Sequence, residues 1–207
     1  RDYIDVVRGN GPLVRLATAG GLIKLLNQMI GDQVAMVMLF GILLGDYGLS
    51  GTIGVIMTIP NLLIVVFISW LATQKGLRWS YVFCLRISTI FYAVELLMLS
   101  RVQPGQWSFE SISLGLVAFM IVWGVAKQFG SQPSTLVLTM TADVSDYEVA
   151  KTGRYVAGMM GTIFSLVDSI ASSLGPVVIG WVVSAIGFAN AYPTADTPLT
   201  PQLRAGT

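Results

Sequence analysis

The stretch SYVFCLRISTIFYAVELLMLS, from Ser80 to Ser100, decides the fold class of this chain of 207 residues. It is mainly apolar, and its two charges, Arg86 and Glu95, each lie about a turn and a half from an end. A membrane helix needs ~20 mainly apolar residues to cross ~30 Å of hydrocarbon. The stretch therefore predicts a transmembrane helix rather than the core of a soluble domain.

Four further stretches also have the length and composition of a membrane helix. The five predicted spans cover about 13–44, 49–73, 80–100, 112–140 and 155–188, with Pro60 near the middle of the second. Backbone groups in lipid must be hydrogen-bonded within their own segment, and nothing alternates with the period of a barrel strand, so each span is expected to be helical. The predicted fold class is an all-α integral membrane protein, with residues 13–188 forming a five-helix transmembrane bundle.

The composition supports this fold class and excludes several functions. The chain is 54% hydrophobic and 11% charged, whereas a soluble domain carries about a quarter charged residues. We therefore expect it to lie in a lipid bilayer. Its net charge of +1 provides no basic field for nucleic acid. The chain has no histidine and a single cysteine, Cys84, which excludes histidine catalysis, a disulfide within the chain and a histidine or thiolate metal site; we expect no metal or cofactor.

Lysine and arginine placement predicts the orientation of the chain. Five crossings put residues 1–12 and the polar tail, 189–207, on opposite sides of the membrane. Seven lysines and arginines fall on the N-terminal side and two on the other: Arg1, Arg8, Arg15, Lys75, Arg78, Lys151 and Arg154, against Arg101 and Arg204. Positive loops stay inside, so we expect residues 1–12 to form a cytoplasmic loop and the tail an extracytoplasmic one.

The first span carries a polar stripe. Lys24, Gln28 and Asp32 are spaced by four and stack on one helix face, with Asn27 beside them. A charge inside a membrane segment costs ~2.5–3.5 kcal/mol by insertion scales and by default marks a functional interior. The alternative is that Lys24 snorkels to the interface and Asp32 only packs against a neighbouring helix. Lys24 lies about a dozen residues inside the span, which favours a cavity lining.

The fourth and fifth spans carry further candidates. Trp123 and Lys127 share a face, with Gln128 beside them, and an aromatic ring near polar groups suits a sugar; alternatively, Trp123 packs on a neighbouring helix. Asp168 lies among serines and is expected either to pair with Lys24 or Lys127 or to bind a cation or proton. Arg86 and Glu95 lie near their own membrane faces, where snorkelling is cheap, and are interpreted as structural.

A membrane enzyme is disfavoured. Asp32 and Asp168 are two membrane aspartates, as an aspartyl dyad needs. However, Asp32 ends the run Met29-Ile30-Gly31-Asp32 rather than the Gly-x-Gly-Asp of intramembrane aspartyl proteases. Acid–base chemistry needs a paired constellation, which is missing, so no enzyme is expected.

The most charged stretch, Thr141 to Arg154, is interpreted as a loop and carries a recognisable motif. Ala142-Asp143-Val144-Ser145-Asp146-Tyr147, followed by Lys151-Thr152-Gly153-Arg154, resembles the corresponding loop of the glycoside–pentoside–hexuronide:cation symporters. These melibiose permease-like proteins belong to the major facilitator superfamily. The likeness extends to Ala185-Ile186-Gly187-Phe188, and Arg1-Asp2-Tyr3 to Gly11-Pro12 is similar to the family's central loop.

The resemblance implies that the five helices are the seventh to eleventh of twelve. The N-terminal half of the same transporter and the last helix would then be missing from this chain. In this fold the seventh and tenth helices line the central cavity. The resemblance therefore implies the following cavity residues: Lys24, Asn27, Gln28, Asp32, Trp123, Lys127 and Gln128. Asp168 is added to them from the eleventh helix. The charged loop would latch the cytoplasmic gate through ion pairs of Asp143, Asp146, Lys151 and Arg154.

The expected function is secondary active transport of a sugar or glycoside with H⁺ or Na⁺, by alternating access, in the bacterial inner membrane. The chain departs from the family at two places: Asp168 stands where melibiose permease-like members carry a lysine, and Ser134 stands close to the place of a tryptophan. A non-transporting receptor on the same fold and an exporter of amphipathic compounds are the alternatives.

Overall fold

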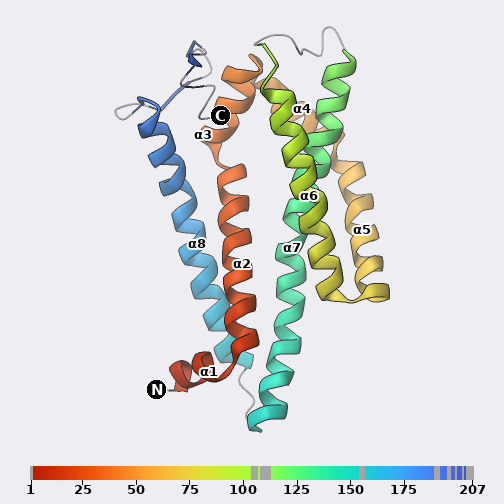
Figure 1. Cartoon of the computed structure of the whole chain (residues 1–207), viewed down its shortest axis with the longest axis vertical. Helices are drawn as coiled ribbons and strands as arrows, with labels where there is room; N and C mark the ends of the chain where they lie inside the picture. The colour runs from red at the N-terminus through yellow and green to blue at the C-terminus, as the bar shows by residue number, and fades with distance from the viewer. Residues whose placement is uncertain are drawn as a thin grey trace.

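Figure 1 shows the computed structural model as a bundle of long helices that run along one common axis. The structure describes residues 2–103, 107, 113–153 and 157–188 and, in the tail, 192–194, 197, 198, 200, 201 and 203. Within these residues every regular element is helical, which confirms the all-α class. The elements are α1 (Asp2–Gly9), α2 (Gly11–Ile30), α3 (Gln33–Met36), the π-helix η1 (Val37–Leu43), α4 (Gly48–Ile56), α5 (Thr58–Lys75), α6 (Leu77–Leu99), α7 (Leu114–Thr152) and α8 (Ala157–Ala185).

Four of these helices are long and apolar enough to cross a membrane by length and composition: α5, α6, α7 and α8. α2 and residues 33–43 pass the same test together, although the two parts are bent by 47°, and they make a fifth span if the bent pair crosses as one. Each predicted span therefore has a matching helix or pair of helices. The protein is a multi-pass membrane protein.

The first span is broken, although the sequence predicted one helix over 13–44. α2 ends at Gly31, whose N–H donates to the Asn27 carbonyl. Asp32 then caps the start of α3, because its Oδ1 accepts the Val34 N–H at 2.8 Å. A capping carboxylate satisfies a backbone donor that has no partner within the new helix, which stabilises a helix start inside the span.

The second span is also divided, at Met57, into α4 and α5. Pro60, predicted to lie near the middle of one helix, is the third residue of α5. A proline is tolerated there because the first turn of a helix leaves its N–H groups without helical acceptors.

The charged stretch from Thr141 to Thr152 is not a loop as predicted: it continues α7, which ends at Gly153 in a left-handed conformation with φ of 70°. The stretch contains no glycine or proline before Gly153, and charged side chains do not break a helix that has left the apolar core. In Figure 1 the end of α7 extends well below the ends of α5 and α6. Arg154 lies outside the described residues.

α7 forms the centre of the bundle. In its most apolar window 44% of the residues are buried, against 11–22% in the other three long spans. The largest apolar cluster gathers around Phe40, Phe119 and Trp123, towards the end of the bundle away from α1. Closer to the middle, α2, α7 and α8 present polar side chains to one another, and the candidate site lies there.

Candidate functional site

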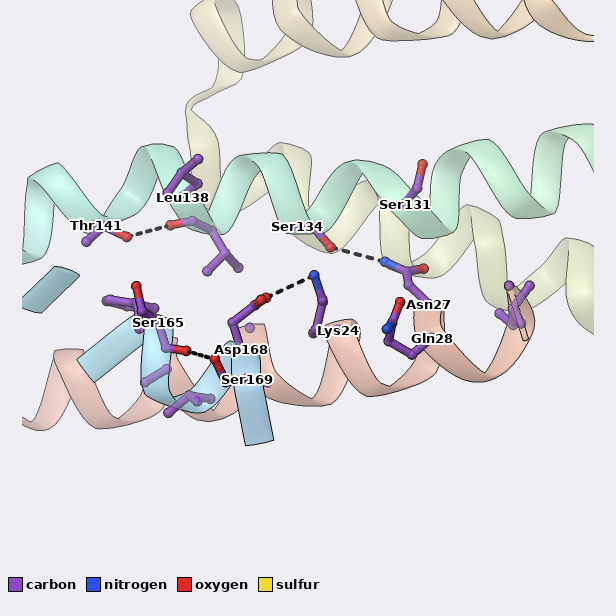
Figure 2. Close-up of a pocket in the computed structure, with 18 of the residues that line it drawn as sticks. Lys24, Asn27, Gln28, Ser131, Ser134, Leu138, Thr141, Ser165, Asp168 and Ser169 are labelled. Carbon is purple, nitrogen blue, oxygen red and sulfur yellow. Dashed lines mark hydrogen bonds and ion pairs between the residues drawn. The ribbon is translucent and has the colours of Figure 1, made fainter. Parts of the chain in front are cut away.

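A cavity of about 740 Å³ lies between α2, α7 and α8, with Tyr92 of α6 at its edge. Five of the residues predicted from the sequence line it: Lys24, Asn27, Gln28, Lys127 and Asp168. Figure 2 shows side chains from α2, α7 and α8 converging on this space. Its volume is in the range of small-molecule sites, a few hundred to about 1,000 Å³.

Lys24 and Asp168 form an ion pair across the cavity, with Nζ and Oδ1 3.2 Å apart (Figure 2). The sequence left open whether Asp168 pairs with Lys24 or with Lys127, and in the structure it pairs with Lys24. The side chains are 35% and 55% exposed. Both charges are therefore within reach of a ligand in the cavity.

Two glycines bring α2 and α8 close enough for this ion pair. A Cβ at Gly21 would lie 2.7 Å from Val167 Cγ1, and a Cβ at Gly175 would lie 2.7 Å from Gln28 Cβ. Real Cβ atoms essentially never show such distances, so each glycine is needed for the close approach. Gly20 serves the same purpose towards α7, where its Cβ would lie 2.9 Å from Val137.

The cavity wall is rich in amide and hydroxyl groups. Asn27 Nδ2 donates to Ser134 Oγ at 3.1 Å and ties α2 to α7. Other hydroxyls donate to carbonyls of their own helix: Ser131 to Gln128, Thr141 to Val137, and Ser169 to Ser165. A hydroxyl that has donated its hydrogen can still accept one. The wall therefore offers acceptors on α7 and α8 to a ligand rich in hydroxyl groups.

A second cavity, of about 470 Å³, adjoins the first, and the two share Ile30, Tyr92 and Lys127 as lining residues. Its other walls are mostly leucine, isoleucine, methionine and valine. Lys127 lies at the boundary, with its Nζ 4.5 Å above the Trp123 ring centroid.

Trp123 lines this smaller cavity and not the larger one. Its side chain is 5% exposed and packs edge-on against Phe40, with ring centroids 5.5 Å apart. With Lys127 over one face, the ring does not present an open platform to the larger cavity. The alternative of a packed tryptophan describes its position best.

Asp32 and Gln128 lie outside both cavities, although the sequence predicted them as lining residues. The Asp32 carboxylate caps α3, which turns it away from the polar stripe where the helix breaks. Gln128 Nε2 donates to the Asn61 carbonyl of α5 at 3.4 Å and joins α7 to α5. The spacing argument for Asp32 assumed a continuous helix, and the helix is interrupted between α2 and α3.

Glu95 was interpreted as a structural residue near the interface, but it is 8% exposed and lines the smaller cavity. Its Oε2 is buried and accepts no hydrogen bond from the described residues. The sequence held a signal for this position: Ser88, Tyr92 and Glu95 follow helical spacing and make one polar stripe on α6.

Three of the four predicted gate residues, Asp143, Asp146 and Lys151, lie in the part of the chain that the structure describes. Asp143 and Asp146 are exposed on α7 and make no ion pair with a described residue. Lys151 instead donates from Nζ to the Gly9 carbonyl and lies 6.0 Å from the Tyr147 ring centroid. Arg154 falls outside the described residues.

Glu148, which the sequence analysis missed, holds the two ends together. Its Oε2 accepts a hydrogen bond from Asn10 Nδ2 at 2.9 Å, and the two side chains are 4% and 0% exposed. Asn10 Oδ1 also caps α2 by accepting the Leu13 N–H at 2.9 Å. The start of α2 is thereby fixed to the end of α7.

In the described part of the chain, no three acidic or cysteine side chains gather as a metal ion would require. No curated protein and no solved structure matched the chain in comparison. The family model described as MFS/sugar transport protein matches residues 1–204. Proteins of this kind are generally transporters rather than enzymes, which agrees with a polar cavity between apolar helices. The chain therefore belongs to the MFS/sugar transport protein family, within the major facilitator superfamily.

Proposed function

We propose that this transporter moves a sugar or glycoside together with H⁺ or Na⁺, and that the larger cavity forms part of its substrate site. The observation that carries the proposal is the Lys24–Asp168 pair in a cavity walled by Asn27, Ser131 and Ser134. Hydroxyl groups of a sugar both donate and accept hydrogen bonds. An ammonium, a carboxylate and several hydroxyls in one space offer partners of both kinds.

The ion pair also suits a site that opens and closes. Both side chains are partly exposed within the described part of the chain, so a bound hydroxyl can reach either partner. In an alternating-access cycle the two halves of a transporter rock about a site near the membrane midplane. Lys24 on α2 and Asp168 on α8 would lie on that site.

We further propose that the chain contributes helices seven to eleven of a twelve-helix, melibiose permease-like symporter, with its N-terminal half completing the site. The sequence motif at Ala142–Tyr147, in α7, and the bias of seven basic residues against two support this placement. The N-terminal end would face the cytoplasm of a bacterial cell, with the protein in the inner membrane. No metal, organic cofactor or nucleic acid takes part in the proposed cycle.

An exporter of amphipathic compounds is the second candidate, because the smaller cavity is apolar and joins the polar one at Lys127. A polar headgroup in one cavity and an apolar group in the other would use both. A receptor on the same fold would bind without turnover.

The test is uptake of a labelled panel of sugars, glycosides and amphipathic glycosides into vesicles that hold the complete transporter. Na⁺ and H⁺ gradients are imposed separately. Accumulation of a sugar or glycoside that follows one gradient supports symport and identifies the ion. Binding without accumulation supports a receptor, and transport of only the amphipathic compounds supports the exporter; either result contradicts the proposal.

A further inference from the structure

Glu95 is the one acidic side chain among the described residues that line the smaller cavity. Its side chain is 8% exposed, and its buried Oε2 has no hydrogen-bond partner in the described part of the chain. Leu96, Leu99 and Met36 are among the apolar residues that line the same space. A carboxylate charge in such surroundings, without a donor or cation at Oε2, is strongly disfavoured relative to the neutral acid.

Two other titratable groups line this cavity. Tyr92 lies one turn before Glu95 on α6, and Lys127 extends from α7. The lining residues from α2, α3, η1 and α8 are all apolar. Lys127 makes no ion pair with Glu95; its ammonium stays over the Trp123 ring, 4.5 Å from the centroid.

We propose that Glu95 binds a proton and that Lys127 changes its position according to whether Glu95 is protonated. In the arrangement of this structure the carboxyl carries a proton, and Lys127 rests on Trp123. When the proton leaves, the carboxylate attracts the ammonium of Lys127 off the ring and into an ion pair. Lys127 and Tyr92 also border the larger, more polar cavity, so the released proton can leave towards that cavity.

This inference rests on the proposed function and deepens it, because it identifies the proton as the coupling ion. A hard metal cation is normally held by several oxygen ligands at once. The smaller cavity offers only the Glu95 carboxyl and the Tyr92 hydroxyl among its lining side-chain oxygens. A proton needs a single oxygen. Because Lys127 lines both cavities, its movement would carry the protonation state of Glu95 to the substrate space.

The direct test is infrared spectroscopy of the complete transporter in lipid nanodiscs, with the proton itself as the ligand. The carbonyl stretch of a protonated carboxyl is expected at neutral pH in the wild type, shifted in D₂O and absent in Glu95→Gln. Glu148→Gln is the matched control, because Glu148 is also buried but accepts a hydrogen bond from Asn10. It should keep the band. A band unchanged by Glu95→Gln, or no band at neutral pH, would overturn the inference.

Transport measurements separate this inference from the proposed function. With the sugar or glycoside that the wild type accumulates, Glu95→Gln should lose proton-driven accumulation at least tenfold and keep exchange between equal concentrations. Proton-driven accumulation at the wild-type level in Glu95→Gln overturns the inference while the symporter proposal stands. If the infrared band depends on Glu95 but no panel compound is transported, the proton site stands and the sugar-symport proposal fails.

Discussion

Asn10→Asp tests the connection between the start of α2 and the end of α7. The new carboxylate can still cap α2, because asparagine and aspartate are about equal as N-caps. It cannot donate to Glu148, whose Oε2 now accepts from Asn10 Nδ2 at 2.9 Å. The substitution therefore removes the link between the two helices and leaves the cap in place.

The expected loss of stability has two parts. A hydrogen bond to a charged group contributes about 1.5–3 kcal/mol. Two carboxylates at the 2.9 Å of the present contact would repel by about 6 kcal/mol at an effective dielectric constant of ~20, an upper limit that relaxation and water will reduce. The free energy of unfolding should fall by more than about 2 kcal/mol. Gln74→Glu, which adds a charge to an exposed residue, should change it by less than about 0.5 kcal/mol.

The decisive variant combines Asn10→Asp with Glu148→Gln. An amide at 148 can donate to a carboxylate at 10, which restores the hydrogen bond with donor and acceptor exchanged. Equilibrium unfolding in mixed micelles of the wild type, both single variants and the double variant gives the coupling energy. We expect a coupling energy of at least about 1.5 kcal/mol, so that the double variant is more stable than the sum of the two single effects would make it. Additive effects, within about 0.5 kcal/mol, would refute the proposed contact.

Three further predictions concern the cavity and the helix contacts around it. Asp168→Asn should abolish active uptake by the complete transporter, and wild-type accumulation in this variant would refute a role for the carboxylate. Lys24→Cys and Gln28→Cys should react with a water-soluble thiol reagent and be protected by a transported sugar. Cys84 is buried and should give no background labelling. Equal labelling of Asp32→Cys, with equal protection, would contradict the position of Asp32 outside the cavity. Gly21→Ala should lower the unfolding free energy by about 1–3 kcal/mol through the clash with Val167, and Gly54→Ala, which meets nothing within 4 Å, should not.

The predicted residues that line the larger cavity lie on helices that are regular there. Lys24, Asn27 and Gln28 all belong to the unbroken part of the first span, and four-residue spacing is a reliable guide there. The choice between Lys24 and Lys127 as the partner of Asp168 could not be made from spacing. It depends on the close approach of α8 to α2, which Gly21 and Gly175 permit.

The predictions that failed depend on where helices end and on which side chains the tertiary packing buries. The sequence alone does not show whether an aspartate such as Asp32 lines a cavity or caps a new helix. Glu95 and Glu148 have charges that suggest exposure, yet packing against α7 and against the α1–α2 junction buries them. A helix end leaves no periodic pattern in the sequence. The burial of Glu95 is indicated only by the polar stripe that Ser88, Tyr92 and Glu95 form on α6.

The break at Gly31 and Asp32 gives the first span a joint. Below it, α2 is held to α7 by Asn27 and to α8 by Lys24; above it, Phe40 and its neighbours pack with Trp123 and Phe119 of α7. A continuous helix would transmit any tilt of one segment along its whole backbone hydrogen-bond ladder. Here that ladder is interrupted between α2 and α3, and the two segments meet at an angle of 47°. The first span therefore consists of two segments that meet at Gly31 and Asp32. One segment contacts the polar cavity, and the other packs in the aromatic cluster.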